Sequence, residues 1–198
     1  VGKFSVTQNP LDLEKAEIDY VKPEQVTAFE FGYRGVVNSI VIDFSTYYNV
    51  YKDFIGNKTV VNPYYGKVDF SDGTYPIPGQ PTPKAVVALA SGDYQAFQTY
   101  TNSAADISSY GAAIGLSTKV MGNFDIGMNY TWAKFDFDQA SDPDYEAGFN
   151  TPEHKVKVSF GNNNIGHNFG FRLDARWNDA YLWESTFIDA MLPARTTM

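Results

Sequence analysis

The segment Ile40–Phe54, with the sequence IVIDFSTYYNVYKDF, indicates the fold of this chain. Successive side chains of a β-strand point to opposite faces. The even-numbered residues from Ile40 to Val50 are mainly apolar, whereas the odd-numbered residues include Asp43 and Asp53. The segment is about twice the length of a mean strand in soluble proteins, and a tilted membrane-spanning strand needs about 9–11 residues. We therefore interpret this segment as one strand of a transmembrane β-barrel.

The same alternation recurs along the chain. Further strands are predicted over Gln25–Val36, Phe97–Val120, Phe124–Phe137, Glu153–Gly161 and Phe169–Trp183. The connections between the strands are alternately short and long, and outer-membrane barrels combine short periplasmic turns with longer extracellular loops. The pattern predicts an all-β fold of antiparallel, up-and-down transmembrane strands, forming a partial barrel of about six strands with long extracellular loops.

We expect residues 1–198 to be part of a single barrel domain. The longest connection, residues 55–97, is predicted to be an exposed loop, because its run of prolines forbids a continuous central strand. Weak strand signals remain within it at Lys58–Val61 and Ala85–Leu89. On the strand Phe124–Phe137, the apolar alternation changes phase near Lys134, which would fit a β-bulge or the end of the membrane-spanning part.

The composition excludes several classes of function. The net charge of −8 argues against a nucleic-acid partner, which would require an excess of Lys and Arg. The absence of cysteine excludes disulfides and thiolate metal sites. His154 and His167 lack metal-ligand spacing, and no hydrolase or phosphate-binding motif occurs. We therefore expect no enzyme activity, no metal site and no cofactor. The acidic loop Asp136–Glu146 is interpreted as solvated, with a calcium site as the alternative.

The two faces of the predicted strands have different roles. The apolar face is expected to contact lipid or to form the aromatic girdle, and its residues are Phe29, Phe31, Tyr33, Ile42, Phe44, Tyr48, Tyr130, Trp132 and Trp177. The polar face is expected to line the barrel interior, as a hydrated wall of mixed charge or as a surface that docks a plug domain or lines a ligand route. Its residues are Glu30, Arg34, Asp43, Lys155, Lys157, Arg172, Asp174 and Arg176.

Three tyrosines of the long connection are candidates for ligand binding. Tyr64, Tyr65 and Tyr75 carry aromatic rings that could stack on a sugar or a chelate. The alternative is that these rings pack among themselves at the surface.

Four motifs, in this order, resemble segments of TonB-dependent outer-membrane receptors, particularly of the Bacteroidetes type. They are KPE at Lys22–Glu24 with FEFGYRG at Phe29–Gly35, YYNVYKDF at Tyr47–Phe54, YTN at Tyr100–Asn102 leading to Tyr110-Gly111, and TPEHK at Thr151–Lys155. The resemblance implies an outer-membrane location and energised uptake of a scarce ligand, such as an iron chelate, a cobalamin or a glycan. It also implies four partners: the lipid bilayer, a plug domain of the same parent protein, TonB, and the small-molecule or glycan ligand.

The chain departs from the family in lacking a plug and a TonB box. Even the smallest membrane barrels need about 8 strands. We therefore expect the chain to be a fragment, the C-terminal part of the receptor's barrel. Two alternatives from other classes remain: a passive porin or structural outer-membrane barrel, and a soluble β-sandwich that acts as a carbohydrate-binding or adhesin domain.

Overall fold

The computed structural model describes residues 2–3, 14–15, 19–64, 91–142, 145–166, 169–184 and 189–198. The chain divides into two compact units. The first unit comprises residues 1–24, 53–105 and 139–147, and the second comprises residues 25–52, 106–138 and 148–198. No helix in the described part of the chain is long and apolar enough to cross a membrane.

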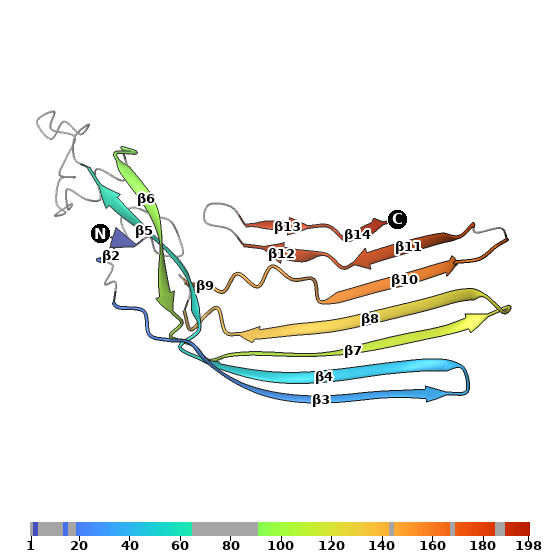
Figure 1. Ribbon diagram of the computed structural model, residues 1–198. Helices are drawn as coiled ribbons and strands as arrows, with labels where there is room; N and C mark the ends of the chain where they lie inside the picture. The colour runs from blue at the N-terminus through green and yellow to red at the C-terminus, as the bar shows by residue number, and fades with distance from the viewer. Residues whose placement is uncertain are drawn as a thin grey trace, which may run out of the picture. The chain divides into compact units, whose positions relative to one another are not determined.

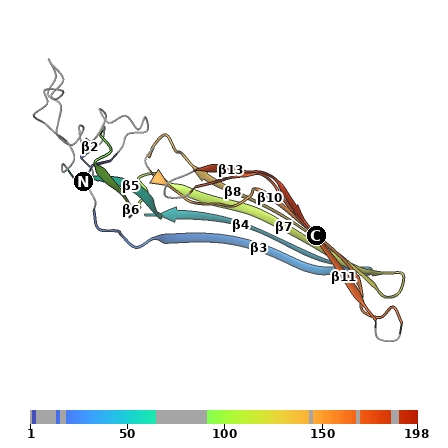
Figure 2. The ribbon, with the colours of Figure 1, turned by 90° about the horizontal axis from the view of Figure 1, so that it is seen from above.

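The second unit is built on one seven-stranded sheet in which every neighbouring pair is antiparallel. Its strands, in spatial order, are β3 (Gln25–Val37), β4 (Ile40–Lys52), β7 (Ile107–Val120), β8 (Phe124–Phe137), β10 (His154–Asn162), β11 (Phe171–Asn178) and β14 (Arg195–Thr197). Figure 1 shows the long strands side by side in one layer, and Figure 2 shows the same strands from above. A short pair, β12 (Tyr181–Trp183) with β13 (Ala190–Leu192), follows β11.

Two tight turns explain why the strands reverse where they do. Asn38, between β3 and β4, has a φ of 56°, in the left-handed region that asparagine tolerates. Met121 and Gly122, between β7 and β8, have φ values of 48° and 83°. The Thr118 hydroxyl donates a hydrogen bond to the Ser39 carbonyl at 3.0 Å, which ties the two turns together. At their other ends, β4, β8 and β11 lead along the chain into the longer connections 53–106, 138–153 and 179–194.

The first unit has its own small sheet. Its strands are β1 (Gly2–Lys3), β2 (Glu14–Lys15), β5 (Ile55–Pro63), β6 (Tyr94–Asn102) and β9 (Tyr145–Glu146). β5 and β6 pair from Ile55–Asn102 to Pro63–Tyr94. Because β9 pairs with β5 at Asn57 and Lys58, the connection between β8 and β10 adds a short strand to this hairpin.

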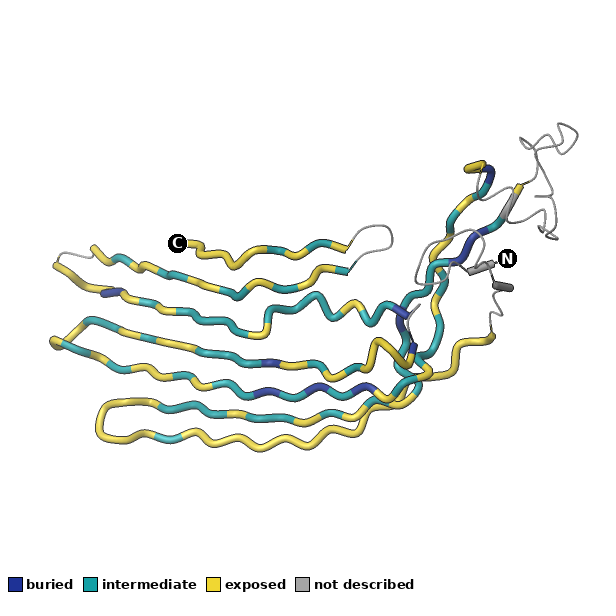
Figure 3. Tube along the Cα trace, turned by 180° about the vertical axis from the view of Figure 1, so that it is seen from behind, coloured by how far each residue is buried: buried dark blue, intermediate teal, exposed yellow. Residues whose placement is uncertain are grey.

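Buried apolar side chains are few among the described residues. The fully buried ones include Val61 and Tyr145 in the first unit and Ile107 at the start of β7. Figure 3, coloured by burial, shows that most of the sheet of the second unit is exposed or intermediate. That sheet therefore has no second layer packed on it within the described part of the chain.

The all-β, antiparallel prediction is confirmed, with strand Phe124–Phe137 placed correctly. Four details are wrong. Phe97–Val120 is not one strand, because its first part belongs to β6 of the small sheet and its second part is β7 of the seven-stranded sheet. The connection 55–97 is not a plain loop, because β5 and the first four residues of β6, Tyr94–Phe97, lie at its two ends. The weak strand signal at Lys58–Val61 falls within β5, whereas the one at Ala85–Leu89 lies outside the described residues. No bulge occurs near Lys134, because the β7–β8 register runs unbroken from Ile107–Phe137 to Val120–Phe124. The last long strand ends at Asn178, and β14 returns beside it as a seventh strand.

Candidate functional site

The apolar face of the seven-stranded sheet carries all nine residues predicted for it. One row across the sheet shows this directly: Tyr33 pairs with Phe44, and the row continues through Ile114, Tyr130, Val156 and Trp177. Phe29 and Phe31 are 64% and 63% exposed, which is unusual for large aromatic side chains. The structure therefore places these side chains together on one uncovered surface, and their contact with lipid stays a prediction.

An aromatic cluster occupies this face near the long-connection end of the strands. The Tyr48 ring stacks on Tyr110 with 6.2 Å between centroids, and Tyr110 meets Trp132 edge-on at 5.6 Å. The Trp132 indole N–H donates to Glu153 Oε1 at 3.1 Å, and the Tyr130 hydroxyl lies 2.8 Å from His154 Nδ1. The rings thus pack on one another, while the Trp132 indole N–H and the Tyr130 hydroxyl are hydrogen-bonded, as expected at a membrane–water boundary.

The polar face carries all eight charged residues predicted for it. Arg34 pairs with Asp43 across β3 and β4, and the same row continues through Gly115 and Asn129 to Lys157 and Arg176. Arg195, on β14, also lies on this face because it pairs with Asn178. Arg195 is missing from the predicted set because a three-residue strand has no readable alternation. That the eight charged residues line the interior of a barrel stays a prediction.

Three ion pairs hold charges together on the polar face. Arg34 binds Asp43 through Nε at 2.8 Å and also through Nη2. Lys119 Nζ lies 2.7 Å from Asp125 Oδ1, and Arg172 binds Asp174 through Nε at 2.9 Å. Two of the pairs join residues directly opposite on neighbouring strands, which is the favourable arrangement for opposite charges.

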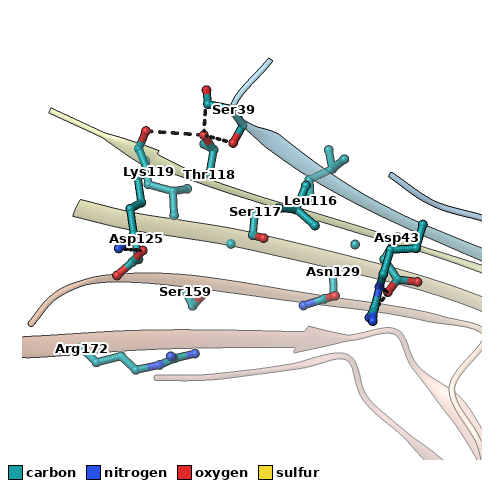
Figure 4. Close-up of a pocket in the computed structure, with 15 residues that line it drawn as sticks. Ser39, Asp43, Leu116, Ser117, Thr118, Lys119, Asp125, Asn129, Ser159 and Arg172 are labelled. Atoms are coloured by element: carbon teal, nitrogen blue, oxygen red, sulfur yellow. Dashed lines mark hydrogen bonds and ion pairs between the residues drawn. The ribbon is translucent and has the colours of Figure 1, made fainter. Parts of the chain in front are cut away.

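A hollow of about 720 Å³ lies over the same face. Figure 4 shows its lining, with Asp43 on β4, Asp125 and Asn129 on β8, and Arg172 on β11. Its floor is low because residues such as Gly115, Gly127 and Ser159 have small or no side chains. The hollow is therefore a shallow depression over the sheet, lined by charged side chains together with apolar ones such as Val41 and Leu116.

The first unit contains one further polar cluster, centred on Tyr145. Tyr145 is fully buried, and its hydroxyl donates to the Phe54 carbonyl at 3.0 Å. Asp142 accepts a hydrogen bond from the Ala104 N–H at 3.0 Å and forms an ion pair with Lys58 at 3.5 Å. Burial, together with the negative charges of Asp142 and Glu24, raises the pKa of the Tyr145 phenol above its usual range. This cluster fastens the loop 139–147 to β5.

The remaining predicted site residues are placed as follows. Tyr64 is 51% exposed and its hydroxyl donates to Gln95 Oε1. Tyr65, Tyr75, Asp144 and His167 lie outside the described residues. Within the described ranges, no group of three or more His, Asp or Glu side chains is arranged to hold a metal ion. Stacking of a ligand on Tyr64, Tyr65 and Tyr75 stays a prediction.

Comparison with known families gives a match over almost the whole chain. The model of the TonB dependent receptor-like β-barrel matches residues 4–197. The chain belongs to this family. The predicted family and barrel class are therefore confirmed. The members of this family are receptors and transporters of the outer membrane. The Bacteroidetes type stays a prediction.

Solved structures show the same fold. The chain is similar to the FrpB iron transporter from Neisseria meningitidis (F3-3 variant), with 12% identity and a TM-score of 0.56 over 90% of this chain and 23% of that chain. It is also similar to the copper transporter OprC, with 14% identity and a TM-score of 0.57 over 90% and 22%. The chain thus spans about a quarter of the length of these transporters. No curated protein matches it.

Proposed function

We propose that this chain forms part of the barrel wall of a larger TonB-dependent receptor, which takes up a scarce ligand across the outer membrane. The ligand classes that fit are an iron chelate, a cobalamin and a glycan. The observation that carries the proposal is the two-faced sheet of a chain that belongs to this family. Membership favours this role over a passive porin and over a soluble β-sandwich.

The apolar face supports a position in the bilayer. Its exposed side chains include Phe31 at 63% and Leu173 at 64%. A contiguous surface of this kind is rarely left open to water, because about 25 cal/mol is lost for each Å² of apolar area that stays hydrated. The strands β3, β4, β7 and β8 have 13 or 14 residues, which is enough to cross the bilayer at a tilt. Lipid is the partner that fits this face.

The polar face supports a role in docking a plug domain and lining the ligand route. It offers paired charges such as Arg34–Asp43, together with the hydrogen-bonding side chains Asn129 and Ser159 around the hollow. In the receptor, the plug would contact this face and TonB would act on the plug. Tyr64, with Tyr65 and Tyr75 on the same connection, would contact the ligand at the outer surface.

Uptake measurements test the proposal. Cells that express the receptor are given a radioactive iron chelate, labelled cobalamin or a labelled oligosaccharide. We expect accumulation of one class, and we expect that accumulation to stop when TonB is deleted or the proton gradient is collapsed. Uptake that continues at the same rate without TonB would show that the protein is a passive porin.

A further inference from the structure

The cations of the polar face are concentrated on three neighbouring strands. β10 presents Lys155 and Lys157, β11 presents Arg172 and Arg176, and β14 presents Arg195. The same faces of these strands carry one acidic residue, Asp174. Its carboxylate binds Arg172 through Nε at 2.9 Å and Nη2 at 3.2 Å. The other four cations, Lys155, Lys157, Arg176 and Arg195, are called the basic wall below.

The strand register sets like charges opposite each other in the basic wall. Lys157 lies directly across from Arg176. In the next row, Lys155 pairs with Asn178, and Asn178 pairs with Arg195. Like charges directly opposite on one face of a sheet repel and reduce stability. Elsewhere on the polar face, by contrast, the opposed charges Arg34–Asp43 and Lys119–Asp125 have opposite signs.

The surroundings of the basic wall do not neutralise it. On the adjoining strand β8, the residues paired with Lys155 and Lys157 are the neutral Thr131 and Asn129. Asp174 also attracts Lys157 and Arg176, but its two oxygens are bonded to Arg172. Within the described residues, no carboxylate forms an ion pair with any cation of the basic wall. A positive surface of this kind calls for an anionic partner from elsewhere.

The position of the basic wall along the strands indicates where that partner arrives. Lys155 follows the connection 138–153, whereas the short turns and the Arg172–Asp174 pair lie toward the other end of the strands. In outer-membrane barrels, the long connections face the outside. The basic wall is therefore in the half of the barrel that an incoming solute reaches first.

We propose that the basic wall binds an anionic solute that carries two or more carboxylate or phosphate groups, for example a negatively charged metal chelate. The inference rests on the proposed transport function and names its substrate class. An arginine guanidinium binds a carboxylate or phosphate with two parallel hydrogen bonds, and a lysine adds a point charge. Adjacent strands are about 4.7–4.9 Å apart, so a single anionic group can bridge Lys157 and Arg176. Lys155 and Arg195 then receive the second group.

Binding to the purified, full-length receptor tests the inference without an energised membrane. The probes are ferric citrate and inorganic pyrophosphate, measured by isothermal titration calorimetry. The double variant Lys157→Gln/Arg176→Gln should weaken binding by about 100-fold, at about tenfold for each charged hydrogen-bonding group removed. The matched control Lys119→Gln removes a cation of the same face that has its own partner, Asp125, and should leave the affinity unchanged within about twofold.

A stability measurement separates this inference from a structural role of the same cations. If a solute is the partner, the double variant relieves repulsion in the empty receptor, and its midpoint of urea unfolding should equal or exceed that of the wild type. A lower midpoint would mean that an acidic segment of the protein already neutralises the cations, and would overturn the inference. Equal binding of both probes by the wild type and the double variant, or binding by neither, would overturn it too. Uptake that does not depend on TonB would contradict the proposed transport function. It would not bear on whether the basic wall binds an anion.

Discussion

Arg34 on β3 and Asp43 on β4 face each other across one rung of the sheet, and the guanidinium binds the carboxylate through two of its nitrogens. The two residues are nine positions apart in the sequence, on the two strands joined by the turn at Asn38. Both side chains are largely exposed, at 79% and 47%. The pair thus forms because the β3–β4 register sets the two residues opposite each other. Both side chains remain accessible to a further polar partner.

The Arg34–Asp43 pair should add little to stability by itself. Asp43→Asn is expected to cost about 0.2–1 kcal/mol, the range for an exposed ion pair. Urea unfolding of the receptor in detergent measures this, and a double-mutant cycle with Arg34→Gln isolates the pair. A coupling energy above about 2 kcal/mol would show instead that the pair is desolvated by another part of the protein.

Adjacent residues on β7 should differ in their access to water. Leu116 lies on the apolar face and Ser117 on the polar face, and the natural chain has no cysteine to interfere. In intact outer membranes, a water-soluble maleimide should label Ser117→Cys and leave Leu116→Cys unlabelled. Both variants should react equally once the protein is unfolded in urea, which is the control. Equal labelling in the membrane would place both faces in water and contradict the barrel.

The close approach of β7 to Tyr47 should make Gly111 sensitive to substitution. A Cβ atom at this position would lie 2.8 Å from Tyr47 Cε1 and 2.5 Å from the Trp132 carbonyl oxygen. Gly111→Ala is therefore expected to destabilise the sheet by about 1–3 kcal/mol through overpacking. Gly32→Ala is the matched control, because its Cβ would have only the Phe44 carbonyl oxygen nearby, at 3.7 Å. Equal unfolding midpoints for the two variants would contradict the packing around Tyr47.

The attachment of loop 139–147 should weaken at high pH. The folded-state pKa of Tyr145 is raised above the ordinary tyrosine value of about 10. The folded state therefore holds the phenol proton more tightly than the unfolded state does. The resulting stabilisation is complete below about pH 10 and is lost as the pH rises through the folded-state pKa. Hydrogen exchange of the β5 and β9 amides should report this loss.

The variant Tyr145→Phe provides the control for that pH dependence. It lacks the titrating hydroxyl and the hydrogen bond to the Phe54 carbonyl, so it should exchange faster at neutral pH, by an amount equivalent to about 1 kcal/mol. Its exchange should show no additional opening above pH 10. An alkaline loss of protection of the same size in Tyr145→Phe would assign the effect to another group.

Long strands were predictable from the sequence because alternation over 13 or 14 residues repeats the signal many times. The ends of Phe124–Phe137 are predicted correctly, and so are its two faces as far as Ala133. The three-residue strand β14 and the two-residue strand β9 carry too few alternations to be recognised. For the same reason, neither Arg195 nor the buried Tyr145 could be assigned from the sequence alone.

The arrangement of charges required the strand register. The sequence shows both signs in near balance on the polar face, because alternation assigns a face but not a neighbour. The register shows that Arg34 lies opposite Asp43, a residue of opposite charge. It also shows that Lys157 lies opposite Arg176, a residue of the same charge. Likewise, the aromatic residues Phe135 and Phe137 indicate from the sequence either a bulge near Lys134 or the end of the membrane-spanning part, and the register excludes the bulge. In the unbroken ladder they lie on the polar face, where Phe135 stacks on Phe149 with 3.8 Å between ring centroids.

The unbroken register also constrains how such a chain can diverge during evolution. A single inserted or deleted residue within β7 would exchange the two faces for every residue beyond it, exposing charges to lipid and aromatic rings to water. Changes in the ligand that the polar face binds must therefore arise by single substitutions at every second residue of a strand. Changes in length are confined to the connections, so the outer loops can diverge quickly while the wall beneath them retains its spacing.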